Sequence, residues 1–175
     1  RDVVSWNALI LGYAQLGENA KALNTFNRMR DEGQTPDVVT FIGVLNVCSH
    51  ALLVDKGEAY FDAMSKDYDI SPTLEHYTCM VDLYGRGGHV DNVIEIIRRM
   101  PLHPDIVMWH IMLTTCRKCG HLELALLAFD HAVGLDAKAV ATYVSMSNIY
   151  ADVRLQKEIK KVEIFTHMDQ TWKGK

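Results

Sequence analysis

Apolar side chains recur along this chain at helical spacing, and the same pattern starts again every 32 to 36 residues. Five aromatic residues head the pattern, with steps of 35, 36, 32 and 34 residues between them: Trp6, Phe41, Tyr77, Trp109 and Tyr143. Apolar residues or cysteines follow the first four at three, four and seven positions, which places them on one face of an α-helix. The fifth copy has Ser147 at the middle position. A period of this size predicts an array of helical repeats.

Turn and capping residues predict two helices in each repeat. A residue suited to cap a helix N-terminus precedes four of the first helices, at Asp2, Asp37, Thr73 and Asp105. Glycines eleven residues after the aromatic mark the turn to the second helix in three units, at Gly17, Gly88 and Gly120. A proline ends the preceding helix one residue before three of the caps, at Pro36, Pro72 and Pro104. We therefore predict an all-α fold, a right-handed superhelical solenoid of antiparallel helix pairs.

These marks divide the chain into successive units. Three repeats are expected at residues 3–37, 38–73 and 74–105, and two degenerate repeats at 106–139 and 140–170, with a short tail at 171–175. The fifth unit is expected to be incomplete. Because the pattern is already under way at Arg1, which is not a methionine, we expect a piece of a longer array.

The order of unit lengths and the amino-acid sequence of several stretches resemble the plant pentatricopeptide repeat family. The resemblance is to the C-terminal end of its subclass with standard, long and short repeats, whose last repeats are followed by two E motifs. It is carried by DVVSWNALILGYAQLGENAKAL, PDVVTFIGVLNVCSHALLVDKGEAYFDAMSKDYDISPTLEHYTCMVDLYGRGG, MPLHPDIVMWHIMLTTCRKCGHLELA and YVSMSNIYAD. The E motifs would occupy residues 106–170. Tetratricopeptide repeats share the period but expect a regular 34 residues and a different layout of aromatics and glycines.

Composition narrows the classes of function. A hydrophobic content of 49% with 23% charged residues is ordinary for a folded domain, and no apolar run approaches the roughly 18 residues that span a membrane. The net charge of −4 argues against binding that rests on phosphate contacts alone, and so against DNA. Only the end of the chain is basic, from Lys157 onward. The four cysteines fit a reduced compartment better than a disulfide framework.

The resemblance implies that pairs of residues read single RNA bases. One member stands directly after the aromatic and the other ends the unit, which gives Asn7 with Asp37 and Thr78 with Asp105. An amide or hydroxyl can hydrogen-bond the edge of a splayed base, and a nearby carboxylate can orient it. By the family's code the first pair would favour a pyrimidine, most of all uridine, and the second a purine, most of all guanosine. Ile42 at the equivalent place has no polar group, so the second unit should read little.

Val4 and Val39 would flank the bases as apolar walls for stacking. The competing interpretation of Asp37 and Asp105 is that both simply cap helices, and the two roles are compatible. Each stacked base contributes roughly 1–3 kcal/mol, so two reading units supply about 2–6 kcal/mol before the cost of association. We therefore expect this chain alone to bind RNA weakly.

The sequence gives little support for a metal site or a catalytic centre. The sole CxxC, Cys116 with Cys119, has His121 nearby but no second ligand pair, and Cys116 falls on the core stripe of its helix. A zinc deaminase also needs a His-x-Glu, and the one instance, His121 to Glu123, follows the CxxC instead of preceding it. We predict no catalytic centre, no metal and no cofactor in this chain.

The E-type units carry a poor base-reading pair, His110 with Ala139, so their expected function is contact with other proteins. The resemblance implies recruitment of a deaminase domain in trans and contact with small editing cofactor proteins. It also implies a plastid or mitochondrial location and a role in selecting sites for cytidine-to-uridine editing of organellar RNA. The alternative function is a protein–protein interaction scaffold without direct RNA contact.

Overall fold

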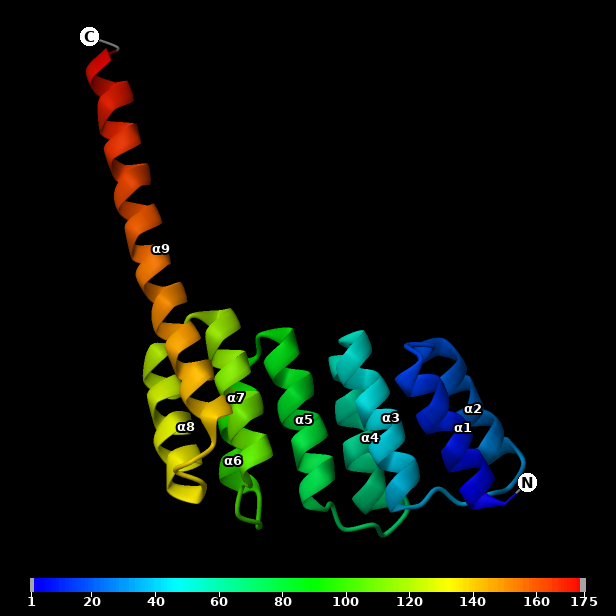
Figure 1. The fold of residues 1–175 in the computed structure, drawn as a ribbon. Coiled ribbons are helices and arrows are strands. Elements are labelled where there is room, and N and C mark those ends of the chain that lie inside the picture. The colour runs from blue at the N-terminus through cyan, green and yellow to red at the C-terminus, as the bar shows by residue number, and fades with distance from the viewer. Residues whose placement is uncertain (1, 174–175) are drawn as a thin grey trace.

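The computed structural model describes residues 2–173, with side chains for 2–118 and 120–157. Within that part the chain forms nine helices and no strand: α1 (Val3–Gln15), α2 (Asn19–Asp31), α3 (Val38–Ala51), α4 (Val54–Asp67), α5 (Leu74–Gly87), α6 (Val90–Arg99), α7 (Ile106–Cys119), α8 (Leu122–Leu135) and α9 (Val140–Lys173). The helices stand side by side in an elongated array, with the chain ends at opposite extremes (Figure 1). The predicted all-α repeat solenoid is confirmed.

The first helix of each of the first four units begins directly after the predicted cap. The carboxylates of three aspartates accept the hydrogen bond of a backbone N–H three residues on: Asp2 from Ser5 at 2.8 Å, Asp37 from Thr40 at 2.9 Å and Asp105 from Met108 at 2.9 Å. Each bond satisfies a donor that the first turn of a helix would otherwise leave without a partner. The predicted N-caps at these three aspartates are confirmed.

The turn between the paired helices requires a left-handed backbone. Gly17, Gly88 and Gly120 adopt φ values of 73°, 78° and 67° at this turn, a conformation that glycine reaches without steric cost. The second unit has no glycine there, and Leu52 takes φ 55° instead. A side chain with a Cβ rarely occupies this region, so Leu52 is a strained solution to the same turn.

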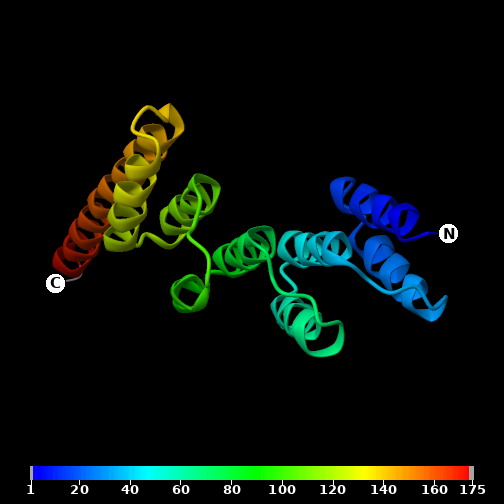
Figure 2. The ribbon, with the colours of Figure 1, turned by 90° about the horizontal axis from the view of Figure 1, so that it is seen from below.

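The helices form two layers. The first helices, α1, α3, α5, α7 and α9, pack one on the next, and we call them the first-helix layer. The second helices, α2, α4, α6 and α8, each pack between their own first helix and the following one. Second helices pack mainly on first helices, and side chains of α2 and α4 also meet through the rings of Phe26 and Tyr60. The view along the helices shows the row of first helices with α2, α4 and α6 on one side (Figure 2).

Aromatic side chains join neighbouring units inside the core. Phe26 of α2 is almost fully buried, and its ring lies edge-on to Phe41 of α3, with ring centroids 6.1 Å apart. The same ring meets Tyr60 of α4 at 5.3 Å, also edge-on. Such pairs add to the free energy of burial. One residue of the first unit therefore anchors two helices of the second.

Small residues let neighbouring first helices approach closely. A Cβ added at Gly85 of α5 would lie 2.1 Å from the Thr115 hydroxyl oxygen of α7, and one added at Gly43 of α3 would lie 2.9 Å from a methyl of Ile10 in α1. Glycine at these places removes the side chain that would hold the helices apart. By contrast, Gly12 in α1 has open space around it.

The core pattern of the fifth unit differs from the prediction. Residues 140–173 form one helix, and among its described side chains, which end at residue 157, Thr142, Met146 and Ile149 are buried. The apolar pattern places Tyr143 and Tyr150, seven residues further on, on the buried face of this helix, but they are 45% and 50% exposed. The prediction was wrong for these two, because within the described part α9 packs on α7 and α8, and both tyrosines lie where these helices leave α9 partly uncovered.

No helix in the described part is both long enough and apolar enough to cross a membrane. The side chains from residue 158 on, which include most of the basic residues of the tail, lie outside the described residues, as do 174 and 175 of the predicted tail.

Candidate nucleic-acid interface

The structure joins the predicted reading residue of the first unit to the residue that ends that unit. The Asn7 side-chain amide nitrogen donates to Asp37 Oδ1 at 2.9 Å, and the Thr40 hydroxyl donates to Asn7 Oδ1 at 2.6 Å. Asp37 in turn caps α3, and its own backbone N–H donates to the Thr40 hydroxyl at 3.0 Å. The reading residue of one repeat is thus bonded to the N-terminal turn of the next.

These bonds also keep Asp37 ionised. Burial alone would raise the pKa of the Asp37 carboxyl, but hydrogen bonds from the Thr40 backbone, the Asn7 amide and the Thr40 hydroxyl hold the pKa below its ordinary value. A carboxylate can only accept hydrogen bonds, so it requires the donor end of the Asn7 amide to face it.

The predicted stacking residues lie on the surface beside this network. Val4, one turn before Asn7 on α1, is 74% exposed, and Val39, next to Thr40 on α3, is 43% exposed. Asn7 itself is only 6% exposed, at the junction of α1 and α3. A group bound at Asn7 would therefore have an apolar side chain on either side.

The second predicted pair is not joined in this way. The Thr78 hydroxyl donates to the backbone carbonyl of Leu74 in its own helix at 2.8 Å, and the Asp105 carboxylate caps α7. Among the described residues no hydrogen bond links Thr78 with Asp105. Thr78 is left with only acceptor capacity toward a ligand, because its single proton is engaged.

The second unit has the apolar residue Ile42 at the reading position. His76, the polar residue at the junction with the third unit, bonds to groups other than Ile42. The backbone N–H of Thr73 donates to His76 Nδ1 at 3.1 Å, so Nε2 carries the proton and donates to the Val38 carbonyl at 3.1 Å. Burial lowers the pKa of His76, although the Val38 carbonyl and Glu75 oppose this effect. His76 is fully buried and neutral at pH 7.

Acidification is expected to destabilise the chain through His76. The unfolded chain takes up a proton near pH 6.5, whereas the folded one resists it to lower pH, so stability present above about pH 6.5 is lost as the pH falls through the lower folded pKa. The free energy of unfolding, measured by urea denaturation at pH 7 and pH 5, should therefore fall. His76→Gln should reduce this difference, and the same change at the exposed His103 should leave it intact. An equal pH dependence in His76→Gln would contradict the assignment.

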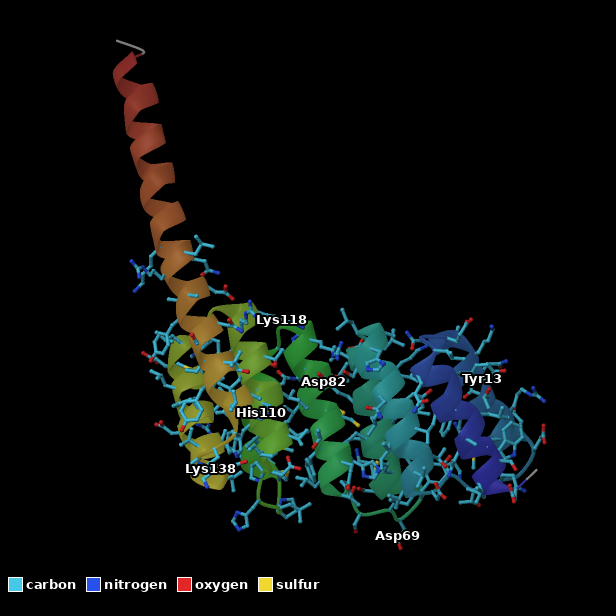
Figure 3. The ribbon with its side chains drawn as sticks, viewed as in Figure 1. Tyr13, Asp69, Asp82, His110, Lys118 and Lys138 are labelled. Carbon is cyan, nitrogen blue, oxygen red and sulfur yellow. The ribbon has the colours of Figure 1, made fainter. Side chains whose placement is uncertain are left out.

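In the fourth unit, the residue directly after the aromatic again bonds to the next repeat. His110 of α7 lies 2.7 Å, through Nε2, from the Thr142 hydroxyl of α9. His110 also lines a groove of about 310 Å³ between α5 and α7, together with Asp82, Arg86, Val107, Ile111, Thr114, Thr115 and Lys118. Figure 3 shows Asp82, His110 and Lys118 on the face formed by these first helices. Both signs of charge line the groove, and Arg86 forms an ion pair with Asp82 at 2.7 Å.

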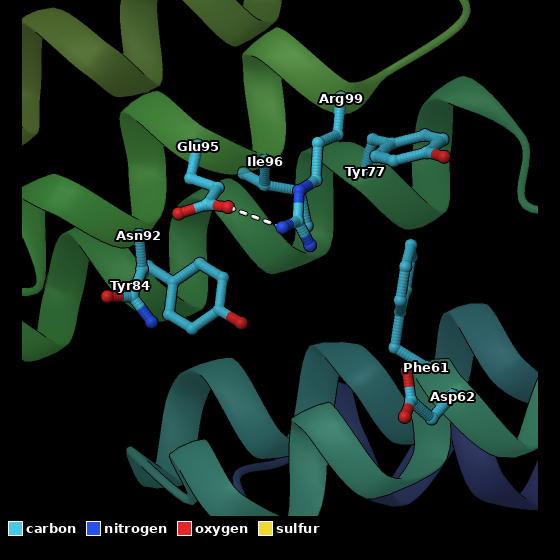
Figure 4. Close-up of a pocket in the computed structure, with 8 residues that line it drawn as sticks. All are labelled: Phe61, Asp62, Tyr77, Tyr84, Asn92, Glu95, Ile96 and Arg99. Atoms are coloured by element: carbon cyan, nitrogen blue, oxygen red, sulfur yellow. Dashed lines mark ion pairs between the residues drawn. The ribbon is translucent and has the colours of Figure 1, made fainter.

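A second cavity, of about 440 Å³, lies among α4, α5 and α6. Phe61 and Tyr77 meet edge-on at one side of it, and Glu95 pairs with Arg99 at another (Figure 4). Its charged residues are already paired within the chain or exposed, and it contains no predicted reading residue. We do not assign a ligand to it.

Cys116 and His121 of the cysteine motif have structural roles. Cys116 is fully buried on the core side of α7, as expected from its spacing to Trp109, and the side chain of Cys119 lies outside the described residues. His121 Nδ1 accepts the backbone N–H of Leu124 at 3.3 Å at the start of α8. Among the described residues no three His, Cys, Asp or Glu side chains gather as a possible metal site.

The residues that bond to Asn7 and His110 were missed in the sequence. Thr40 and Thr142 each stand third in their unit, where the aligned residues of the five units are Ser5, Thr40, His76, Met108 and Thr142. A polar residue recurring at one position of an otherwise apolar helix face was the available signal.

Stacked helix pairs of about 35 residues, with polar contacts that recur at the junctions of the first helices, define a helical-repeat protein of the α-solenoid class. Residues 1–50 match the model of the PPR repeat family, and residues 75–103 match that of the PPR repeat. The chain belongs to the plant pentatricopeptide repeat family.

Individual relatives agree with this assignment. Pentatricopeptide repeat-containing protein At2g20540 of Arabidopsis thaliana is 40% identical over 93% of this chain and 30% of its own length. The chloroplastic protein CRR2 of the same plant is 40% identical over 93% of this chain and 25% of its own length. The chain thus spans less than a third of these curated relatives. The crystal structure of PPR10 in complex with an 18-nt psaJ RNA element has a TM-score of 0.77 at 24% identity, covering 92% of this chain and 25% of that one, which shows the shared fold.

Proposed function

We propose that this chain is the single-stranded RNA-binding repeat segment of an organellar RNA-processing factor, one that selects sites for cytidine-to-uridine editing. The observation that carries the proposal is the hydrogen bond between Asn7 and Asp37, which orients a largely buried amide at the junction of two first helices. Val4 and Val39 stand beside it with apolar surface for a base. The RNA in the PPR10 complex supports RNA as the ligand.

In this proposal the units have unequal roles. Asn7 with Asp37 reads one base and favours a pyrimidine, and Thr78 with Asp105 reads a second base more loosely, because Thr78 offers only acceptor capacity. The segment 106–170, as E-type repeats of the subclass with long and short repeats, recruits a deaminase in trans and contacts small editing cofactor proteins. Relatives named chloroplastic and mitochondrial support a plastid or mitochondrial location.

Selection from a randomised RNA pool tests the reading residues. The chain should enrich a pyrimidine at one position, and Asn7→Ala should abolish that preference, because the alanine offers no hydrogen bond to a base edge. Preferences at other positions should persist. The loss corresponds to roughly 1–3 kcal/mol of discrimination.

A matched control is Asn24→Ala, which removes the same amide from α2, in the second-helix layer. It should leave the enriched sequences unchanged. A pool that stays random with the wild-type chain, under low salt where phosphate contacts are strongest, would argue against RNA recognition by these repeats.

A protein–protein scaffold is the second candidate, and the exposed side of α9 favours it. Val144 and Tyr150 lie exposed on α9, and Leu127 lies exposed on the adjacent α8. Exposed apolar residues on two packed helices are suited to contact another protein. Under this alternative, Tyr150→Ser would abolish retention of a deaminase or editing cofactor, and Asn7→Ala would change neither binding nor sequence preference.

A further inference from the structure

Thr40 belongs to the second unit, yet its hydroxyl donates a hydrogen bond to the reading residue of the first. The hydroxyl oxygen accepts the Asp37 backbone N–H at 3.0 Å, lies 2.6 Å from Asn7 Oδ1 and lies 2.9 Å from Asp37 Oδ1. Thr40 is fully buried between α1 and α3, so it cannot touch a ligand directly. Any effect of Thr40 on binding must pass through Asn7 or Asp37.

Donor and acceptor counting determines how the Asn7 amide is turned. The Thr40 hydroxyl has one proton, and the nearest acceptor is Asn7 Oδ1. The Asp37 carboxylate accepts only, and it takes one N–H of the Asn7 amide. The reversed amide would set its oxygen against a carboxylate and leave the Thr40 proton without its shortest acceptor. The two neighbours therefore hold the amide in one orientation, from both ends.

This orientation leaves a defined set of bonds for a ligand. Of the two N–H bonds of the Asn7 amide, one is used by Asp37, and one remains. A carbonyl oxygen on a pyrimidine edge can accept it. If the amide turned freely, it would offer an oxygen as readily as an N–H, and it would distinguish bases poorly.

The same coupling of positions recurs in the array. His110 and Thr142 stand at the positions of Asn7 and Thr40 in the fourth and fifth units, and they are also in hydrogen-bond contact. Where the fifth residue of a unit is the apolar Ile42, the third residue of the next unit, His76, bonds to backbone and to Thr73 instead.

The third unit completes the comparison. The third residue of the following unit is the apolar Met108, and Thr78 bonds to its own helix. Where the fifth residue of a unit and the third residue of the next are both polar, the two side chains are thus in hydrogen-bond contact.

We propose that Thr40 is a specificity-determining positioning residue, which sets the base choice made by Asn7 across the boundary between two repeats. The reading group of the first unit is then a triad of Asn7, Asp37 and Thr40. The inference rests on the proposed function, since it concerns how an RNA base is chosen.

The first test compares Thr40→Val with Thr40→Ser by selection from a randomised RNA pool. Valine keeps the shape but removes the hydroxyl, and serine keeps the hydroxyl. Thr40→Val should lose roughly tenfold in discrimination, at the same RNA position that Asn7→Ala affects and at no other, because one hydrogen bond with its geometry is lost. Thr40→Ser should match the wild type. A merely structural role would weaken binding to all sequences equally.

Base discrimination unchanged in Thr40→Val would overturn the inference. If Thr40→Val does not fold, Thr40→Cys takes its place, because the thiol is a weak donor of similar size. If the wild-type pool shows no preference at all, the proposed RNA function fails, and a second measurement then decides the positioning role alone.

That second measurement is made without RNA. The side-chain amide signals of Asn7 in the ¹⁵N-labelled chain are assigned by their loss in Asn7→Ala. In Thr40→Val these signals should shift and their hydrogens should exchange with solvent faster, while those of Asn24 stay unchanged. Asn7 amide signals identical in the wild type and Thr40→Val would show that Thr40 does not position the amide.

Discussion

Phe26→Ala is expected to lower the free energy of unfolding by about 3–5 kcal/mol, the usual cost of removing a fully buried aromatic ring. Phe26 is 1% exposed, and its ring touches Phe41 and Tyr60 of the next unit. The substitution therefore leaves a cavity at the junction of two repeats as well as removing apolar surface from the core. The loss falls on the contact that couples the first unit to the second.

Urea denaturation followed by circular dichroism measures this effect. Leu16→Ala is the control, because Leu16 is 77% exposed, and its replacement should change the free energy by less than about 0.5 kcal/mol. A loss below 1 kcal/mol for Phe26→Ala would mean that the first unit is not packed on the second as described.

Gly85→Ala should destabilise the array by about 1–3 kcal/mol, although alanine is the better helix former. The added methyl would lie 2.1 Å from the Thr115 hydroxyl oxygen and 3.2 Å from Thr115 Cβ. Thr115 is buried and donates its hydroxyl to the Ile111 carbonyl at 3.0 Å, so it has little freedom to turn away. Helices α5 and α7 would have to separate.

Gly12→Ala provides the matched control for Gly85→Ala. Nothing lies within 4 Å of the added methyl, so the same substitution should stabilise α1 by about 0.5–1 kcal/mol. A double-mutant cycle with Thr115→Ala should recover part of the loss at Gly85, because the clashing atoms are gone. Similar effects at both glycines, or an absence of coupling to Thr115, would refute the close approach of α5 and α7.

The features that sequence predicted well depend on local chemistry. The caps at Asp2, Asp37 and Asp105 act within three residues, and Gly17 and Gly88 meet a backbone requirement at their own position. The helical spacing of apolar residues can be recognised within the sequence of a single helix. For these reasons the helices and their starts were predictable from the chain alone.

The features that sequence missed depend on register between repeats. Asn7 and Thr40 meet across 33 residues, and the signal for that contact emerges only when the third residues of the units are compared. Thr78 and Asp105 have suitable chemistry at matching positions, yet the Thr78 hydroxyl finds a nearer acceptor in its own helix. Tyr143 fits the apolar pattern, but its exposure follows from what packs on α9, which spacing cannot reveal.

The two layers give the array unequal stiffness. In the described part first helices are packed on one another throughout, whereas second helices pack mainly on first helices and meet in their own layer at Phe26 and Tyr60. Close-packed side chains resist compression, so the first-helix layer keeps its spacing, while the second helices, with fewer contacts in their own layer, can spread or converge more easily. The solenoid should therefore bend by changing the spacing of its second helices, while the spacing of its first helices stays nearly constant. A change of curvature then leaves the spacing of Asn7 and Thr78, which both lie on first helices, nearly unchanged.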